Sequence, residues 1–409
     1  MLAGSVNHTP NFLVRTVSHF RSYPWWAQCV LMWFGVLLLL NGTGLVGSRI
    51  FEPGPSSHAC DNEHQAFDEF PGTWRRWDAC FYIEIANHGY IPNSDTAGFF
   101  PLYPLLIATV QRVTGITMEL AGILVSNFSF LGSTLILYKL ARLVKDDHGF
   151  ALRSVLAMLV FPTSFFYFAI YAESLYLLFA LLGVYLAMKK YPTFIGSGLV
   201  LGISSIARPV GWLIDLVLLG ELIRKKRFDI KSILSLGLGS LFSILGVILY
   251  VYYLYVVLGT FSAIPEAQAH WPRQWQLPWI TYFEGLRTLS TPTLLHSNWF
   301  AYAMNAVDLF FTSFTAIIIL ISFAQARRNE FPWSLSVYAF VTFLFFLSSQ
   351  NELPSPLWGM TRWMASLFPI YFVLGNLFKN RKSQVLYYIA SIVLLVCFTA
   401  WWTSGRWIG

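Results

Sequence analysis

The stretch WWAQCVLMWFGVLLLLNGTGLV, residues 25–46, decides the class of fold. A helix needs about 20 mostly apolar residues to cross the hydrocarbon core of a bilayer. The stretch is too long for the core of a signal peptide and is followed by no small-residue cleavage site. The whole 409-residue chain has the same character, with 56% hydrophobic residues, a mean hydropathy of +0.57 and 11% charged residues. We therefore expect an all-α, multi-pass integral membrane protein whose first span is this stretch.

Further apolar runs predict a bundle of about eleven membrane helices. The expected ranges are 25–47, 118–141, 150–170, 173–188, 192–207, 209–223, 232–259, 298–324, 331–348, 363–378 and 384–402. The segment 99–113 is short and begins with Pro101 and Pro104, so we expect it to be an interfacial helix rather than a span. We expect one transmembrane domain over 1–409, with an extracytoplasmic loop over 48–117 that is long enough to carry function.

The basic residues select the orientation of the bundle. With a cytoplasmic N-terminus, 18 of the 27 basic residues, including every lysine, fall in cytoplasmic loops, as the positive-inside rule requires. The remaining nine are all arginines and fall on the outer side. Counting 99–113 as a span would invert this pattern. The net charge of +7 is spread in short clusters between apolar runs, so it reports membrane orientation and not nucleic-acid binding.

The outer loop contains cysteines and potential metal ligands. Cys60 and Cys80 share this loop and could form a disulfide in an oxidising compartment. The loop also holds a small polar cluster, His58, Asp61, Glu63 and His64. Its spacing fits no known ligand pattern, so no metal site is predicted.

Asp78 is the first candidate catalytic residue. If the helix containing it starts near Thr73, then Trp74, Phe81, Tyr82 and Ile85 lie within about 60° of Asp78. A carboxylate on such an apolar face is costly unless it is paired or used. One interpretation is a structural ion pair with Arg75, three residues earlier. The other is a base held in a pocket at the membrane surface.

Glu173 follows an aromatic run, FPTSFFYFAIYAESLY over 161–176, which we expect to end the third helix at the outer face. Glu173 would then open the fourth helix. An acidic residue is stabilising at a helix N-terminus whether or not it has a function, so both interpretations stay open.

Three arginines on the outer side are candidates for binding phosphate. Arg208 precedes Pro209 between two spans, Arg273 lies in QAHWPR, and Arg362 lies in WGMTRW. The guanidinium group is planar, permanently charged and suited to phosphate. Anchoring to lipid headgroups is the alternative for each arginine singly.

At these residues the sequence resembles the PIG-V family of mannosyltransferases, which add the second mannose to GPI anchors, and their shorter prokaryotic relatives. The matching stretches run from about residue 74 to residue 370. The first two are Trp77-Asp78 with Tyr82, Ile85-Ala86 and Gly89-Tyr90, and then FFPLYP over 99–104. The others are Phe161-Pro162 through Tyr171-Ala172-Glu173-Ser174-Leu175; Ala207-Arg208-Pro209; Gln268 with Trp271 and Arg273; and Arg362 with Phe368-Pro369. The resemblance implies a GT-C fold, a polyprenyl-phosphate-mannose donor, inversion at the sugar carbon and an early outer-loop aspartate as the base. It also implies a substrate pocket containing these motif residues: Trp77, Tyr82, Tyr103, Glu173, His270 and Trp271.

These interpretations combine into one expected mechanism. Asp78 would accept a proton from an acceptor hydroxyl, while Arg208, Arg362 and Arg273 hold the donor phosphate. The protein would lie in a bacterial plasma membrane, use no cofactor, and act on a lipid or glycan acceptor. A polymerase or ligase that uses a diphosphate-linked lipid is one alternative. A transporter is the other, and it would need Asp215 and Asp308, the acids well inside predicted spans.

Overall fold

A computed structural model describes residues 19–51, 69–92, 94–269, 271, 273–291, 299–352, 355–378 and 380–408. Cys60, His270 and the cluster of His58, Asp61, Glu63 and His64 lie outside the described residues, so the predictions made for them are untested. Cys80 is disulfide-bonded, whereas Cys29 and Cys397 are free.

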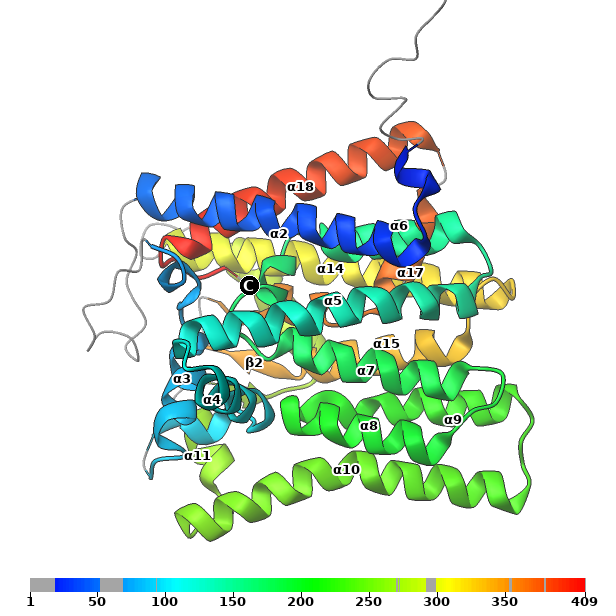
Figure 1. Ribbon diagram of the computed structural model, residues 1–409, viewed down its shortest axis with the longest axis horizontal. Helices are drawn as coiled ribbons and strands as arrows, with labels where there is room; N and C mark the ends of the chain where they lie inside the picture. Colours follow the sequence, from blue (N-terminus) through cyan, green and yellow to red (C-terminus); the bar gives the residue numbers. More distant parts are fainter. Residues whose placement is uncertain are drawn as a thin grey trace, which may run out of the picture.

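Long apolar helices run side by side through the molecule (Figure 1). Five of them are long and apolar enough to cross a membrane: α2 (Trp25–Ile50), α5 (Met118–Val144), α10 (Ile230–Leu258), α14 (Trp299–Arg327) and α18 (Arg381–Thr403). Each contains 23 to 29 residues, which corresponds to about 35–44 Å of helix and exceeds the hydrocarbon core of about 30 Å. The chain is therefore an integral membrane protein, as predicted.

Six shorter helices pack between the long ones. They are α6 (His148–Leu159), α7 (Glu173–Met188), α8 (Phe194–Ala207), α9 (Asp215–Arg224), α15 (Trp333–Leu347) and α17 (Pro369–Leu377). The longest, α7, has 16 residues and a length of about 24 Å, which is less than the hydrocarbon thickness. In Figure 1 these helices lie toward one end of the bundle. Toward the other end, their continuations are residues 160–172, η5 (Pro209–Ile214), β2 (Ser349–Asn351) and α16 (Met360–Ala365), and we call this part of the molecule the site region.

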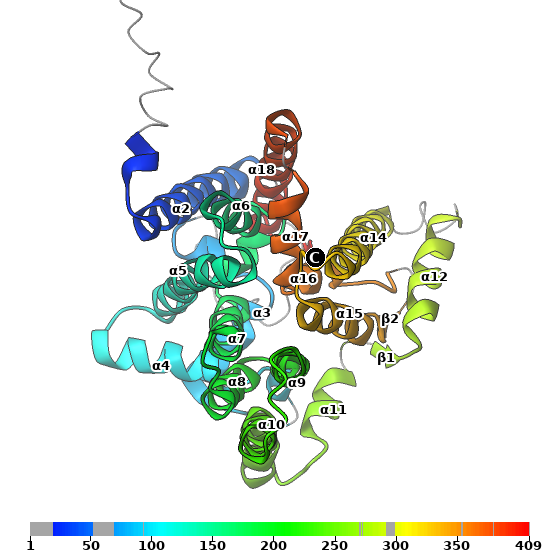
Figure 2. The same ribbon diagram turned by 90° about the vertical axis from the view of Figure 1, so that its right-hand side faces the viewer.

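The end of the bundle next to the site region carries short elements: η2 (Gly72–Trp74), α3 (Asp78–His88), η3 (Asp95–Gly98), α4 (Leu102–Thr114) and α11 (Ala263–Ala269). α12 (Pro278–Leu289) and strands β1 (Arg273–Trp275) and β2 (Ser349–Asn351) lie at the side of the bundle, next to α14 and α15. β1 and β2 are antiparallel, with Arg273 opposite Asn351. Figure 2, which looks along the bundle, shows α4 lengthwise and α5 and α7 end-on. α4 thus runs across the bundle, as expected for the interfacial helix predicted over 99–113.

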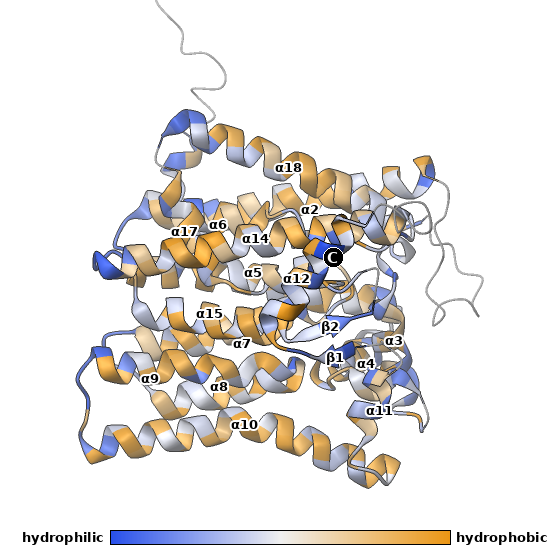
Figure 3. Ribbon diagram, turned by 180° about the vertical axis from the view of Figure 1, so that it is seen from behind, coloured by the Kyte–Doolittle hydropathy of each residue, from blue (hydrophilic) through white to orange (hydrophobic). Residues whose placement is uncertain are grey.

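Lysines gather at the opposite end, which we call the lysine end. There α5, α7 and α9 terminate and α10 and α18 begin. The described lysines lie in or beside these helix ends, at positions 139, 145, 189, 190, 225, 226, 231 and 382. Figure 3 shows hydrophobic residues along the helices and hydrophilic ones mainly at the two ends. The segregation agrees with the predicted topology, while the cytoplasmic location of the lysine end stays a prediction.

The predicted helix over 150–170 is wrong in its second half. α6 ends at Leu159, and residues 160–172 form a buried, largely irregular segment that contains η4 (Ser164–Tyr167). Pro162 cannot continue a helix, and irregular backbone at membrane depth is tolerated where protein surrounds it. Neighbouring side chains satisfy its carbonyls, because Asn127 Nδ2 donates to Phe168 O at 3.1 Å and Ser126 Oγ to Tyr171 O at 3.1 Å.

Two other predicted helices are interrupted. The range 209–223 begins with η5 (Pro209–Ile214) before α9, and the range 363–378 consists of α16 (Met360–Ala365) and α17, which is separated from it at Pro369. The exact number of eleven spans is therefore not confirmed, whereas the all-α class of the protein is confirmed.

The contact between α8 and α10 depends on glycines. A Cβ on Gly239 would lie 2.5 Å from Phe194 O, whereas a Cβ on Gly237, in the same helix, meets nothing within 4 Å. We expect Gly239→Ala to lower the free energy of unfolding by about 1–3 kcal/mol through overpacking. Gly237→Ala should be neutral or slightly stabilising, because alanine is the better helix former. Thermal unfolding of both variants in detergent tests this, and equal stabilities would contradict the close packing.

Candidate active site

Asp78 is the first residue of α3, and the chain reverses direction sharply just before it. Trp77 has a φ of 54°, so the helix cannot extend back to Thr73 as the sequence pattern had predicted. Trp74 instead lies in η2, where its Nε1 donates to Asn41 Oδ1 at 3.0 Å. From Asp78 onward the predicted apolar face holds, with Tyr82 and Ile85 buried.

Asp78 is paired with a distant arginine. Its Oδ2 accepts from Nη1 of Arg362 at 2.5 Å, and its side chain remains 21% exposed. Arg75, the local partner considered from the sequence, instead pairs with Glu119 at 3.2 Å. The structural interpretation of Asp78 as an Arg75 partner is therefore wrong, and the carboxylate lies against Arg362 in the site region.

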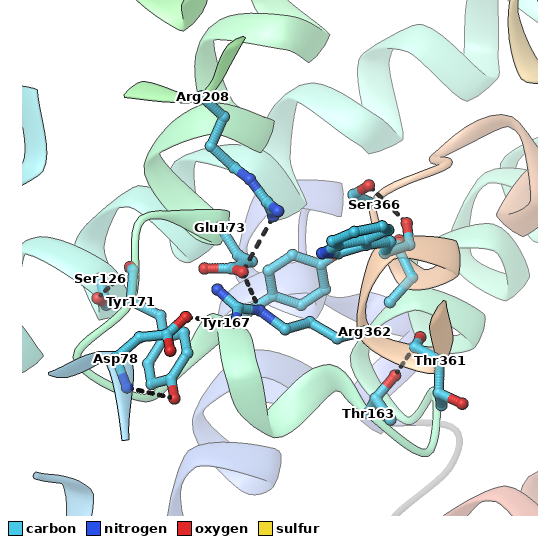
Figure 4. A network of polar contacts seen from close by, with 12 residues as sticks. Asp78, Ser126, Thr163, Tyr167, Tyr171, Glu173, Arg208, Thr361, Arg362 and Ser366 are labelled. Carbon is cyan, nitrogen blue, oxygen red and sulfur yellow. Dashed lines mark hydrogen bonds and ion pairs between the residues drawn. The ribbon is translucent and has the colours of Figure 1, made fainter. Parts of the chain in front are cut away.

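Glu173 links two of the predicted arginines (Figure 4). It is the first residue of α7 and only 2% exposed. Its Oε1 accepts from Nε of Arg362 and from Nη1 of Arg208, the latter at 3.0 Å. Arg208 follows the last residue of α8. The carboxylate of Glu173 therefore lies at a helix N-terminus and the guanidinium of Arg208 at a helix C-terminus, and the helix dipole favours each charge in its position. The resulting chain of contacts is Asp78–Arg362–Glu173–Arg208.

Aromatic rings hold this network in place. The guanidinium carbon of Arg362 lies 4.5 Å from the ring centroid of Tyr171 and 5.2 Å from that of Phe166. The hydroxyl of Tyr171 accepts from the backbone N–H of Asp78 at 3.3 Å and donates to Arg76 O at 3.2 Å. Tyr171 therefore connects the irregular segment 160–172 to the start of α3, a role not foreseen from the sequence.

Asp308 positions the helix that carries Arg362. This buried residue of α14 accepts from the backbone N–H of Thr361 at 2.7 Å, within the first turn of α16. The carboxylate thus satisfies an N–H that has no partner inside the helix. Asp215, the second acid that a transporter would need, accepts from the hydroxyl of Ser243 in α10. Both acids have partners within the fold, which weakens the transporter alternative.

Arg273 differs from the other two arginines because, among the described residues, it has no carboxylate partner. Nη1 donates to Ser349 Oγ at 3.5 Å and Nη2 to Trp358 O at 3.4 Å, and the guanidinium lies 4.4 Å from the ring centroid of Trp363. Burial, with a smaller contribution from the charge of Arg362, lowers the pKa of Arg273 to about 10. The group stays positively charged at neutral pH, so it is available to a bound anion.

The other predicted pocket residues that the structure describes lie among aromatic rings near Asp78. Trp77 contacts Trp407, with centroids 5.5 Å apart, and the partly buried Trp271 contacts Phe81 at 5.7 Å. Tyr82 is buried between several rings, and burial raises its pKa well above the usual value. Tyr103 is fully buried, shares a hydrogen bond of 2.7 Å with Ser126 Oγ and packs against the ring of Tyr82, so it supports Tyr82 rather than offering a group to a substrate.

Three arginines, Arg208, Arg273 and Arg362, lie in the site region together with three carboxylates, Asp78, Glu173 and Asp308. Such a set can orient a hydroxyl next to a carboxylate and hold an anion at guanidinium groups. Within the described ranges, no three His, Cys, Asp or Glu side chains come together as metal ligands would.

The helical bundle gathers carboxylates and arginines at one end, an arrangement suited to the transfer of a group from an anionic donor. Residues 47–283, more than half of the chain, match the family described as Mannosyltransferase (PIG-V). The chain belongs to this family.

Individual proteins are also similar to this chain. GPI mannosyltransferase 2 of Drosophila pseudoobscura pseudoobscura is 27% identical over 111 residues, which cover 25% of this chain and 24% of the relative. The structure of ArnT from Cupriavidus metallidurans bound to undecaprenyl phosphate is similar with a TM-score of 0.52 and 14% identity, covering 90% of this chain and 63% of that one. The Archaeoglobus fulgidus oligosaccharyltransferase gives a TM-score of 0.42 at 14% identity, covering 91% and 53%. The chain thus spans less than two thirds of the length of each of these proteins.

Proposed function

We propose that the protein transfers mannose from a polyprenyl-phosphate-mannose donor to an acceptor hydroxyl, with inversion, at the membrane face opposite the lysine end. The observation that carries the proposal is the network Asp78–Arg362–Glu173–Arg208, in which a residue of the first loop meets residues from three later parts of the chain. Membership of the mannosyltransferase family supports the sugar. ArnT, which has a similar fold, is bound to undecaprenyl phosphate in its crystal structure, and this supports a polyprenyl phosphate as the carrier of the sugar.

Asp78 is the proposed base. Arg362 holds its Oδ2, whereas Oδ1 accepts no hydrogen bond from the part of the chain that the structure describes. Oδ1 would accept the proton of the acceptor hydroxyl as the hydroxyl oxygen attacks the anomeric carbon. The phosphate leaves from the opposite side of the sugar, and the configuration at that carbon inverts.

The arginines would hold the leaving phosphate with different strengths. Arg273 is paired directly with no carboxylate among the described residues and is the primary proposed contact, while Arg362 and Arg208 share Glu173. A lipid-monophosphate sugar carries one negative charge and a diphosphate-linked sugar carries two. The monophosphate is the donor we propose, because undecaprenyl phosphate is the lipid bound to ArnT.

Comparing donors tests the proposal. Purified protein is supplied with labelled mannose on polyprenyl monophosphate or on polyprenyl diphosphate, together with membrane lipids as the source of acceptors. We expect labelled product, identified by mass analysis, from the monophosphate donor only. Transfer from the diphosphate donor alone would establish the polymerase or ligase alternative instead.

The role of Arg273 gives a separate prediction. Arg273→Ala should raise the KM for the donor by about tenfold or more while leaving the KM for the acceptor nearly unchanged, because a charge-assisted hydrogen bond contributes about 1.5–3 kcal/mol. Arg287→Ala is the matched control, since Arg287 lies in the adjacent helix α12 with its side chain 77% exposed. Equal donor KM values for both variants would remove Arg273 from the phosphate site.

A further inference from the structure

The segment that follows α18, residues 404–408, folds back against the site region. α18 ends at Thr403, and Gly405 has a φ of 87°, in the left-handed region that favours glycine. The N–H of Gly405 donates to Trp402 O at 3.0 Å and closes the turn. Trp407 and Ile408, beyond the turn, are both buried, so the chain enters the protein interior at this point. The segment lies outside residues 47–283, the part of the chain that matches the family.

The ring of Trp407 packs against three other rings. It stacks on Trp358 with centroids 5.9 Å apart, meets Trp77 edge-on at 5.5 Å and lies 6.0 Å from Phe166. The four residues come from four separate parts of the chain. Trp407 therefore joins segments that are joined by no strand or continuous helix.

Each of these three rings adjoins a residue of the candidate site. The first belongs to the residue that precedes Asp78 in the chain. The carbonyl of Trp358 accepts from Nη2 of Arg273 at 3.4 Å, and the ring of Phe166 lies 5.2 Å from the guanidinium carbon of Arg362. One buried side chain thus contacts the immediate neighbours of the proposed base and of two arginines.

The conformation of Trp77 depends on contacts from other parts of the chain. A φ of 54° is rare for so bulky a residue, and such a conformation persists only where the surrounding structure fixes it. The hydroxyl of Tyr171 bonds to the peptide groups on either side, Arg76 O and the N–H of Asp78. The side chain of Trp77 is held by packing, because its Nε1 is buried and donates to none of the described residues. Within the described ranges, Trp407 supplies the one ring that Trp77 contacts.

We propose that Trp407 is a positioning residue for the base: it fixes Trp77 in the conformation that directs the Asp78 carboxylate to Arg362. The inference rests on the proposed function, in which Asp78 takes the proton. Asp78 starts α3 directly after Trp77, so a change of φ at Trp77 would displace its carboxylate, and a shift of about 1 Å can lower a rate about 10²-fold. Arg273 depends less on Trp407, because its guanidinium also contacts Ser349 and the ring of Trp363.

Hydrogen–deuterium exchange of the purified full chain, measured by mass spectrometry, tests this placement without using the reaction. The N–H groups of Ala79 and Cys80 donate to carbonyls of the turn before α3, at 3.2 and 3.0 Å, so their protection reports whether the turn is closed. We expect Trp407→Ala to speed exchange at these amides by about tenfold or more, because the turn opens more often without the ring. Peptides from α8 and α10, which Trp407 does not contact, should exchange as in the parent protein.

Turnover is measured on the same variants with labelled polyprenyl-phosphate mannose. Trp407→Ala should lower kcat by about 10–100-fold and leave the donor KM nearly unchanged, because the base is misplaced while the donor contacts remain. Trp407→Phe keeps a ring at this position and should recover most of the kcat. Trp401→Ala is the matched control: it removes the same side chain from the last turn of α18, where the ring contacts Phe51, and should alter neither kcat nor exchange.

The two measurements together decide the proposal. If Trp407→Ala cannot be purified, Trp407→Leu retains more of the apolar volume and should show the same two changes. Faster exchange in α3 with unchanged kcat, a lower kcat with unchanged exchange, or equal effects in Trp401→Ala would overturn the proposal. If the parent protein transfers mannose from no lipid-linked donor, the proposed function fails, whereas exchange at the start of α3 still shows whether Trp407 fixes the turn.

Discussion

Asp78→Asn is expected to reduce mannosyl transfer by about 10²–10⁴-fold, the usual contribution of a general base. Asparagine has nearly the shape of aspartate, and its side-chain oxygen can still accept a hydrogen bond from Arg362. The other contact of Arg362, with Glu173, does not involve residue 78. The protein should therefore fold normally and keep its donor KM, while kcat falls. Turnover measured with saturating donor, together with thermal unfolding in detergent, separates the chemical step from assembly.

Glu84→Gln is the matched control for this loss. Glu84 lies in the same helix, two turns or less from Asp78, and is partly exposed. Its replacement removes the same charge from α3 at a position that faces away from the network, so its kcat should stay near that of the parent protein. If Asp78→Asn turned over at a comparable rate, Asp78 would not be the base, and another acceptor of the proton would have to be sought in the site region.

The long helices could be predicted because hydropathy is a property of local sequence. α2, α5, α10, α14 and α18 are uninterrupted apolar runs, and their ends differ from the predicted ones by at most three residues. The same measure failed over 160–172, where the chain is just as apolar but irregular. Hydropathy reports burial, and it cannot tell burial in lipid, which requires a helix, from burial in protein, which does not. Pro162 was the local sign of the difference.

The residues of the candidate site could be named from the sequence, but their pairing could not. Asp78, Glu173, Arg208 and Arg362 were each expected at the same membrane face, next to a helix end or an aromatic cluster, and the structure brings them into one network. Which arginine meets which acid depends on tertiary packing. Arg362 and Asp78 are 284 residues apart in the chain, whereas Arg75, three residues from Asp78, pairs with Glu119. The strand pair β1–β2, which places Arg273, has only three residues per strand and carries no recognisable pattern.

The Glu173–Arg362 pair leads to the second large expected effect. Arg362 is 8% exposed and Glu173 2% exposed, and removal of Arg362 leaves the buried Glu173 with Arg208 as its remaining cation at 3.0 Å and takes the arginine from Asp78. Loss of one partner of a buried pair costs about 3–5 kcal/mol, and the contact with Arg208 should keep the cost near the lower value, whereas replacing both partners by neutral groups is often tolerated. Arg362→Gln should therefore unfold at a much lower temperature than the parent protein. The double variant Arg362→Gln, Glu173→Gln should recover most of that stability, because neither neutral amide requires a counter-charge.

The double variant also separates folding from phosphate binding. If Arg362 contacts the leaving phosphate, the stable double variant should still transfer poorly, with a raised donor KM and a lowered kcat, because a guanidinium group near the departing anion is missing. Glu173→Gln alone controls for the loss of the acid: it keeps Arg362, and its donor KM should be much closer to that of the parent protein. Recovery of stability together with normal donor KM in the double variant would show that Arg362 serves only to neutralise Glu173 and orient Asp78. Arg273 would then be left as the main contact for the phosphate.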